Sequence, residues 1–503
     1  MRRRSRIGEE RVVESKAGLI APAELQRGRL SNQAVLFQSI AQIAPAGGIA
    51  TVAILGANFA GGALPLATIF SVVASLLVAL SVSELAKHLP SAGSLGTYVA
   101  RSLGGGAGYV IGWMYAISEL LIVSFVSLLI GALVSGLLNS ELGLPVTPVW
   151  IASVIVVYLL VVLVHELGVR VSAGVQLIIG IAEIVFFALL SLVLIADAGA
   201  QNTLSVFTTE YANIEGYSGF AGLFPAAVFI ITAFAGFESA SAVAEEAHEP
   251  RKAVRIAVVG SVLAIGALYL LTSYAATVYF GPDKMADFAS SNNGDPWTGM
   301  TRTVWGIGWV ALFLIIVNSL YGACTASMTV STRMLFSFGR SRLGPTSLGQ
   351  LSDRKTPRNA LAIAALVGFV LAIWLGLAYE PILGLSTIVV ASTSMYIVLY
   401  IVLNIACIAY YWRHRRSEFI WLRHLALPIL GALAFVPVLF VQLGIPVFSF
   451  ISPLQPPLTY GAYAAVAVVV SASAVAVYLA RTAPDRLDRF GAAFDEPIAP
   501  DAR

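Results

Sequence analysis

Residues 44–48 read Ala-Pro-Ala-Gly-Gly and interrupt an apolar stretch, residues 34–58, that is long enough to cross a membrane. Pro45 has no backbone N–H, and its ring collides with the preceding turn of a helix. Gly47 and Gly48 weaken the helix further because they have no side chain to restrict the backbone. We therefore expect a helix break near the middle of this span.

The composition of the 503-residue chain places such a stretch in a membrane. The chain is 58% hydrophobic and 11% charged, with a mean hydropathy of +0.85, whereas a water-exposed surface requires more charge. Transmembrane β-barrels are excluded because their strands alternate and contain no long apolar runs. The predicted class is an all-α polytopic membrane protein with about twelve transmembrane helices. The twelve stretches are residues 34–58, 64–86, 107–138, 148–166, 171–196, 219–245, 254–280, 304–335, 359–379, 382–410, 424–444 and 457–481.

The distribution of basic residues predicts the orientation of these spans, since cytoplasmic loops carry an excess of Lys and Arg. The loops on one side contain only Lys284 and Arg302 of the 30 Lys and Arg residues. We expect a multi-pass protein of the cytoplasmic (plasma or inner) membrane, with the lipid bilayer around it and both termini in the cytoplasm. The net charge of +3 gives no indication of nucleic acid binding.

A second interruption lies in the sixth stretch, at residues 234–239, Phe-Ala-Gly-Phe-Glu-Ser. It follows the first by five spans, and paired breaks in corresponding positions indicate an inverted repeat with substrate bound at the midplane. Freed amides at the half-helix ends can hold a carboxylate, and freed carbonyls can hold an ammonium group. The alternative is that Gly and Pro serve only close helix packing or kinks.

The chain is accordingly divided into four parts. They are a basic cytoplasmic tail (residues 1–33), a transport core of two five-helix repeats (34–410), two further helices (411–481) and a cytoplasmic C-terminal tail (482–503). The N-terminal tail has no apolar segment of the signal-peptide kind.

Four carboxylates are expected within or at the ends of spans: Glu84, Glu119, Glu183 and Glu238. A carboxylate at membrane depth is costly unless it is protonated or faces a polar cavity, so each is a candidate functional residue. Glu84 is expected to form cytoplasmic salt bridges. Glu119 is a coupling candidate, with helix packing or cavity lining as the alternative. Glu238 either lies beside the substrate path or caps the inner half-helix.

Several motifs resemble the amino acid/polyamine/organocation (APC) superfamily of permeases. They span about two thirds of the chain. The matching residues are Glu84 to Gly93 with Tyr98, Gly104 and Gly112-Trp113; Phe234 to Glu238 with Glu245-Glu246 and Pro250-Arg251; and Arg333, Arg340, Pro345 and Thr356-Pro357.

The resemblance implies a five-plus-five core of the leucine-transporter type that works by alternating access. It places Ala46, Gly47 and Gly48 where most relatives have Gly-Ser-Gly against the substrate carboxylate. The substrate site would comprise Pro45, Ala46, Gly47, Gly48, Phe234, Ala235, Gly236, Phe237 and Glu238. Counted from Val175-Gln176, Glu183 stands where many relatives have a lysine and sodium-coupled cousins hold a cation. Glu183 could therefore carry a proton, hold a cation, or be a neutral residue hydrogen-bonded between helices.

The predicted function is a secondary active permease that moves amino acids, with a proton as co-substrate in symport. The alternative is a polyamine or basic amino acid permease or exchanger, favoured by the deep carboxylates; a transporter-like receptor or a channel is the alternative outside transport. An enzyme is not expected, because no His lies at membrane depth and no Lys follows a Gly as a phosphate-binding loop requires. No cofactor or metal site is predicted, and the oligomeric state is left open.

Overall fold

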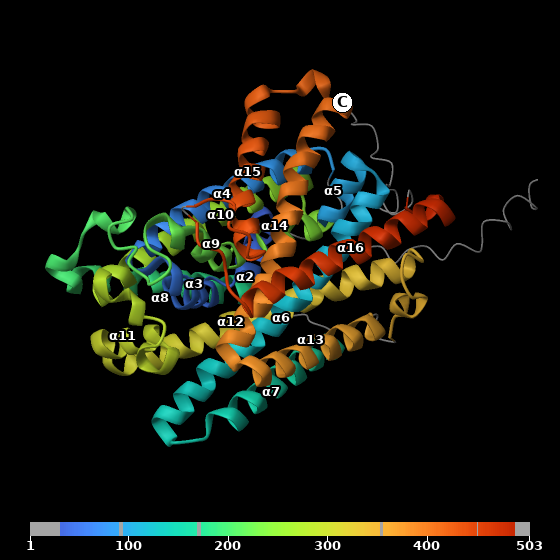
Figure 1. Cartoon of the computed structure of the whole chain (residues 1–503). Coiled ribbons are helices and arrows are strands. Elements are labelled where there is room, and N and C mark those ends of the chain that lie inside the picture. The colour runs from blue at the N-terminus through green and yellow to red at the C-terminus, as the bar shows by residue number, and fades with distance from the viewer. Residues whose placement is uncertain (1–30, 90–93, 168–172, 353–355, 450, 488–503) are drawn as a thin grey trace, which may run out of the picture.

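The computed structural model describes residues 31–89, 94–167, 173–352, 356–449 and 451–487, and the regular secondary structure of these residues is entirely helical (Figure 1). Residues 1–30 of the expected N-terminal tail, residues 488–503 of the expected C-terminal tail, and residues 90–93 of the motif after the second span lie outside the described residues. The helices are α2 (Asn32–Ile43), α3 (Pro45–Ala60), α4 (Leu64–Ala86), α5 (Ser94–Leu103), α6 (Gly105–Leu142), α7 (Val146–Leu167), α8 (Ala173–Ala198), α9 (Leu223–Thr232), α10 (Pro250–Phe280), α11 (Pro296–Trp305), α12 (Trp309–Arg340), α13 (Arg358–Tyr379), α14 (Pro381–His414), α15 (Leu427–Gln442) and α16 (Leu458–Thr482).

Each of the twelve expected spans coincides with a helix or a broken helix. In the described part of the chain, eleven helical stretches are long and apolar enough to cross a membrane. The difference from twelve arises at the first span, because α2 and α3 have only 12 and 16 residues and the outer part of α3 is counted with α4 in one stretch, Ala53–Ala86. Two short helices, α5 and α11, lie in loops and were not predicted.

The burial of the helices agrees with a bundle surrounded by lipid. Most of α6 and α14 is buried, and Figure 1 shows them crossing the centre of the bundle. By contrast, α7 and α16 expose much of their apolar surface, including Leu159 and Val470. Because lipid tails are as apolar as these side chains, such exposure carries no hydrophobic penalty in a membrane.

Contacts between loops and helix ends fall into two sets that agree with the predicted alternation of sides. One set joins regions expected in the cytoplasm: His88 with Glu418, Ser102 with Arg413, Glu166 with Arg358, Asn32 with Glu249, and Arg342 with Arg486. The other joins regions expected outside: Glu141 with Arg302, Gly216 with Ser452, and Gly62 with Tyr211. None of these contacts joins the two expected sides. This agrees with spans that cross the membrane in alternating directions along the chain.

Candidate functional site

The first predicted helix break is present at Ala44. Helix α2 ends at Ile43, Ala44 has left-handed backbone angles (φ 52°, ψ 76°), and α3 begins at Pro45. Proline suits the first turn of a helix, where an N–H has no partner within the helix. The break therefore leaves a C-terminal and an N-terminal helix end beside each other, with unsatisfied carbonyls on one and amides on the other.

The second predicted break lies between α9 and a 3-10 helix, Phe237–Glu246. Gly236 in the intervening turn has φ +110°, which residues with a side chain rarely adopt. A Cβ at Gly236 would also lie 2.7 Å from Cγ of Gln42. Both the backbone angle and the lack of space therefore require glycine at position 236. The second break packs directly against the end of α2.

Two side chains connect the breaks. The Ser39 hydroxyl on α2 donates to the Phe237 carbonyl at 2.9 Å and accepts from the Ala240 amide at 3.2 Å. The Tyr269 hydroxyl on α10 donates to the Ala233 carbonyl at 3.0 Å. A Cβ at Gly48 would collide with that same hydroxyl. The position of Tyr269 thus requires glycine at residue 48 in the first break, and its hydroxyl pairs with the Ala233 carbonyl in the second break.

A small cavity lies between the two breaks, with a volume of about 40 Å³. Its described lining carries no charge and consists of Gln42, Ile43, Ala44, Gly47, Gly48, Thr51, Ile122, Phe125, Val126, Thr232, Ala233, Ala235, Leu320 and Ala323. One water needs roughly 10–15 Å³ of such space, so the cavity has room for a few waters. A larger ligand requires the lining to move.

A second cavity, of about 490 Å³, opens on the side expected to be external. Asn293 and Glu380 from two external loops line it, together with Leu55 and Phe229. Leu55 lies one turn beyond Thr51 on α3, and Phe229 lies about one turn before Thr232 on α9. The larger cavity therefore approaches the smaller one along the outer halves of the two broken helices.

Two fully buried carboxylates lie behind the small cavity. Glu119 on α6 accepts hydrogen bonds from Gln42 Nε2, at 3.2 and 3.3 Å from its two oxygens, and from the Tyr396 hydroxyl at 2.8 Å. Glu238 accepts from the Gly236 amide at 3.3 Å and from the Tyr400 hydroxyl at 3.4 Å. The amide contact is the kind expected of a cap at the start of the inner half-helix.

Glu183 on α8 is 4% exposed and reaches the first break from another direction. Its Oε2 accepts a hydrogen bond from the Ser319 hydroxyl on α12 at 2.7 Å. The Ala46 backbone and the Asn318 side chain are also within interaction range of the carboxylate. Glu183 therefore joins α8, α12 and the start of α3.

The predicted site residues occupy different positions around the cavity. Gly47, Gly48 and Ala235 line it, whereas Pro45, Ala46, Gly236 and the three carboxylates lie behind the lining. Phe234 and Phe237 are fully buried; their rings contact Tyr269 and Tyr400, with ring centroids 5.0 and 5.4 Å apart.

The sequence analysis did not identify Gln42, Tyr269, Ser319, Tyr396 or Tyr400. Gln42 carried a usable signal, because it is an amide in an apolar span just before the Pro-Gly interruption. Tyr396 and Tyr400, spaced by four on one predicted helix, gave a weaker signal that is also typical of packing. Nothing in the sequence distinguished Tyr269 and Ser319 from neighbouring residues.

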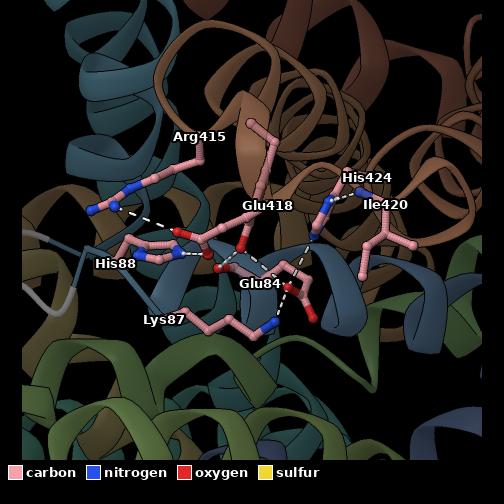
Figure 2. A network of polar contacts seen from close by, with 8 residues as sticks. Glu84, Lys87, His88, Arg415, Glu418, Ile420 and His424 are labelled. Atoms are coloured by element: carbon pink, nitrogen blue, oxygen red, sulfur yellow. Dashed lines mark hydrogen bonds and ion pairs between the residues drawn. The ribbon is translucent and has the colours of Figure 1, made fainter.

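Glu84 forms the expected salt bridge with Lys87, within a larger network at the inner end of α4 (Figure 2). The Ile420 amide donates to His424 Nδ1 at 2.9 Å, which leaves Nε2–H to donate to Glu84 Oε2 at 3.2 Å. His88 Nε2 lies 3.1 Å from Glu418 Oε2, close enough for an ion pair but not aligned for a hydrogen bond. The network fastens α4 to the connection between α14 and α15. Glu245 and Glu246 belong to the motif after the second break, and their side chains are not among those that the structure describes.

Comparisons with known proteins agree over most of the chain. A family model described as amino acid permease matches residues 34–491. The branched-chain amino acid permease BcaP of Lactococcus lactis is 24% identical over 416 residues, 78% of this chain and 84% of that protein. BcaP of Bacillus subtilis is 28% identical over 60% of this chain and 65% of its own length. The aromatic amino acid transport protein AroP of Corynebacterium glutamicum is 26% identical over 63% of this chain and 67% of its own.

Proposed function

Because this chain belongs to the amino acid permease family, we propose that it carries amino acids across the cytoplasmic membrane by alternating access, in symport with protons. The observation that carries the proposal is the meeting of two helix breaks around a small cavity. Helix ends there offer backbone amides to a carboxylate and carbonyls to an ammonium group.

The two cavities support alternating access. The larger one leads from the expected external side toward the smaller one, while the cytoplasmic side carries the network of Glu84, Lys87, Glu418 and His424. We interpret this arrangement as that of a carrier closed on the inside. Transport then requires this network to loosen while the outer cavity closes.

The lining of the small cavity favours neutral amino acids over polyamines or basic amino acids. Ile122, Phe125, Val126 and Leu320 form apolar walls, and Glu119 and Glu238 lie outside the described lining. A cationic side chain placed here would lose its hydration without reaching a carboxylate, which is costly.

Glu183 is the proposed proton carrier. Its carboxylate contacts both the start of α3 and Ser319 on α12. Gain or loss of a proton there changes which hydrogen bonds the carboxylate can make, and so changes the contact between the first break and α12. Such a change is what a coupling site must produce.

Uptake into proteoliposomes tests this function. The purified protein would be supplied with labelled neutral, aromatic and basic amino acids and with polyamines, with and without an imposed pH gradient. Accumulation of a neutral amino acid driven by the gradient is expected. The matched control is Gly47→Leu, because a Cβ at Gly47 would lie 2.6 Å from Leu320 Cδ2 and the larger side chain would fill the cavity.

Uptake of no amino acid by the wild type would contradict the transport proposal and favour a receptor. Uptake that follows only the amino acid gradient would contradict proton coupling. Currents far above carrier rates would favour a channel.

A further inference from the structure

Gln42 carries an unpaired hydrogen-bond acceptor beside the cavity. The side chain is 4% exposed, lies in the last turn of α2 and contributes to the cavity lining. Its Nε2 is engaged by Glu119, but its Oε1 is buried and has no hydrogen-bond partner. Buried polar atoms are nearly always paired, so an unpaired one beside a binding cavity calls for an explanation.

The chemistry of Glu119 determines which end of the amide is left unpaired. The amide nitrogen of Gln42 lies 3.2 and 3.3 Å from the two carboxyl oxygens of Glu119, and of the two ends of an amide only the nitrogen can donate. The Tyr396 hydroxyl donates to Oε1 of the same carboxylate at 2.8 Å. Glu119 therefore holds Nε2, and Oε1 of Gln42 is left buried without a hydrogen-bond partner.

The two hydroxyls of the lining and one carbonyl of the second break already form hydrogen bonds. The Thr51 hydroxyl donates to the Gly47 carbonyl at 2.9 Å, and the Thr232 hydroxyl donates to the Val228 carbonyl at 2.8 Å. The Ala233 carbonyl of the second break accepts from Tyr269. Gln42 provides the one side-chain amide in the described lining.

The position of Gln42 also suits a cation. It lies at the C-terminal end of α2, where the helix dipole favours positive charge, whereas the N-terminal end of α3 favours negative charge. An amino acid bound across the break would have its carboxylate toward α3 and its ammonium group toward α2.

We propose that Gln42 Oε1 accepts a hydrogen bond from the substrate's α-ammonium group, and that Glu119 positions this amide by holding its nitrogen. The inference rests on the proposed function, since it needs an amino acid in the cavity. It makes Gln42 the residue that distinguishes an amino acid from the same molecule without its amino group.

The test compares two ligands with the same carbon skeleton, L-leucine and 4-methylpentanoate, in equilibrium binding to the purified protein. The wild type should prefer L-leucine. Gln42→Met, which keeps the length of the side chain and removes the oxygen, should reduce that preference roughly 10- to 100-fold, as expected for one hydrogen bond to a charged donor. The loss should fall on L-leucine and leave 4-methylpentanoate unchanged.

Gln442→Met is the matched control. Gln442 is also a fully buried glutamine, but it lies on α15 and hydrogen-bonds Ser394, away from the cavity lining. This variant should keep the wild-type preference. If Gln42→Met does not fold, Gln42→Asn serves in its place, because its shorter amide cannot reach both Glu119 and the ligand.

The positioning role of Glu119 is tested by rescue. Glu119→Met should lower the preference for L-leucine as Gln42→Met does, whereas Glu119→Gln should restore it, because the new amide oxygen can accept from Gln42 Nε2. The variant with both Met substitutions should lose no more than Gln42→Met alone.

Two results would overturn the proposal while leaving the transport function intact. One is a wild-type protein that transports leucine yet binds 4-methylpentanoate equally well; the other is an unchanged preference in Gln42→Met. A wild type that transports no amino acid overturns the proposed function first, and this inference with it.

Discussion

Replacing Gly236 by alanine tests whether the second helix break depends on its contact with α2. Two independent effects are expected at this position. The backbone has φ +110°, and the added Cβ would lie 2.7 Å from Gln42 Cγ and 3.1 Å from Gln42 Cβ. Neither the turn nor the last turn of α2 can move without disturbing the cavity.

The magnitude follows from these two effects. Holding alanine at such a φ costs about 1–3 kcal/mol, and forcing a methyl group into a packed site costs about 1–3 kcal/mol more. We therefore expect Gly236→Ala to lower the free energy of unfolding by about 2–6 kcal/mol.

Two other glycines separate these contributions. Gly104 has the same φ of +110° but no atom within 4 Å of the added Cβ, so Gly104→Ala should cost about 1–3 kcal/mol. Gly322 lies in α12 with open space around it, so Gly322→Ala should be neutral or stabilising by up to about 1 kcal/mol. Denaturant unfolding in detergent micelles, followed by fluorescence, would rank the three variants. Leucine binding should be lost in Gly236→Ala alone. A stability of Gly236→Ala equal to that of Gly104→Ala would refute the close contact with Gln42.

Three further predictions concern coupling, topology and pH. Glu183→Gln removes ionisation but keeps the shape of the side chain, so gradient-driven uptake should fail while exchange of internal for external substrate and substrate binding persist. If gradient-driven uptake, exchange and binding all stay at wild-type values, Glu183 is a structural residue. Cysteines placed at Ser291 and Ser347, in a chain without Cys324 and Cys407, should react with an impermeant thiol reagent from opposite sides of the membrane. Labelling from one side would contradict the predicted topology. Desolvation at the inner end of α4 holds the pKa of His88 below its ordinary value of 6.5. The unfolded chain therefore binds a proton at His88 more tightly than the folded chain does. The free energy of unfolding should consequently fall as the pH drops below about 6.5. His88→Gln should weaken this pH dependence of stability, which unfolding midpoints at pH 5.5, 6.5 and 7.5 would measure. An equal pH dependence in the wild type and in His88→Gln would contradict the role of His88.

The spans could be read from the sequence because each depends on local composition. Twenty or so consecutive apolar residues form a helix across a bilayer whatever their neighbours are. The short helices α5 and α11 were missed because they lie in loops. They are too short or too polar to be recognised as runs of about twenty apolar residues.

The breaks were also predictable, because Pro45 and Gly236 act on their own backbone. The side chains that surround the breaks were not predictable. Gln42 meets Glu119 across 77 positions, and Glu183 meets Ser319 across 136, so these pairs depend on how α2, α6, α8 and α12 pack.

The sequence by itself determined the membrane setting, the approximate spans and the places where two helices break, because hydropathy and backbone restriction are properties of short segments. Only the tertiary structure decided which groups face the cavity between the breaks. In the sequence Glu119 was a coupling candidate and Glu238 a candidate for the substrate path or a helix cap, yet neither is among the described lining residues, whereas Gln42 lines the cavity and contacts Glu119. The physical reason is that a side chain's partner at membrane depth is set by the packing of distant helices, which a single span does not encode.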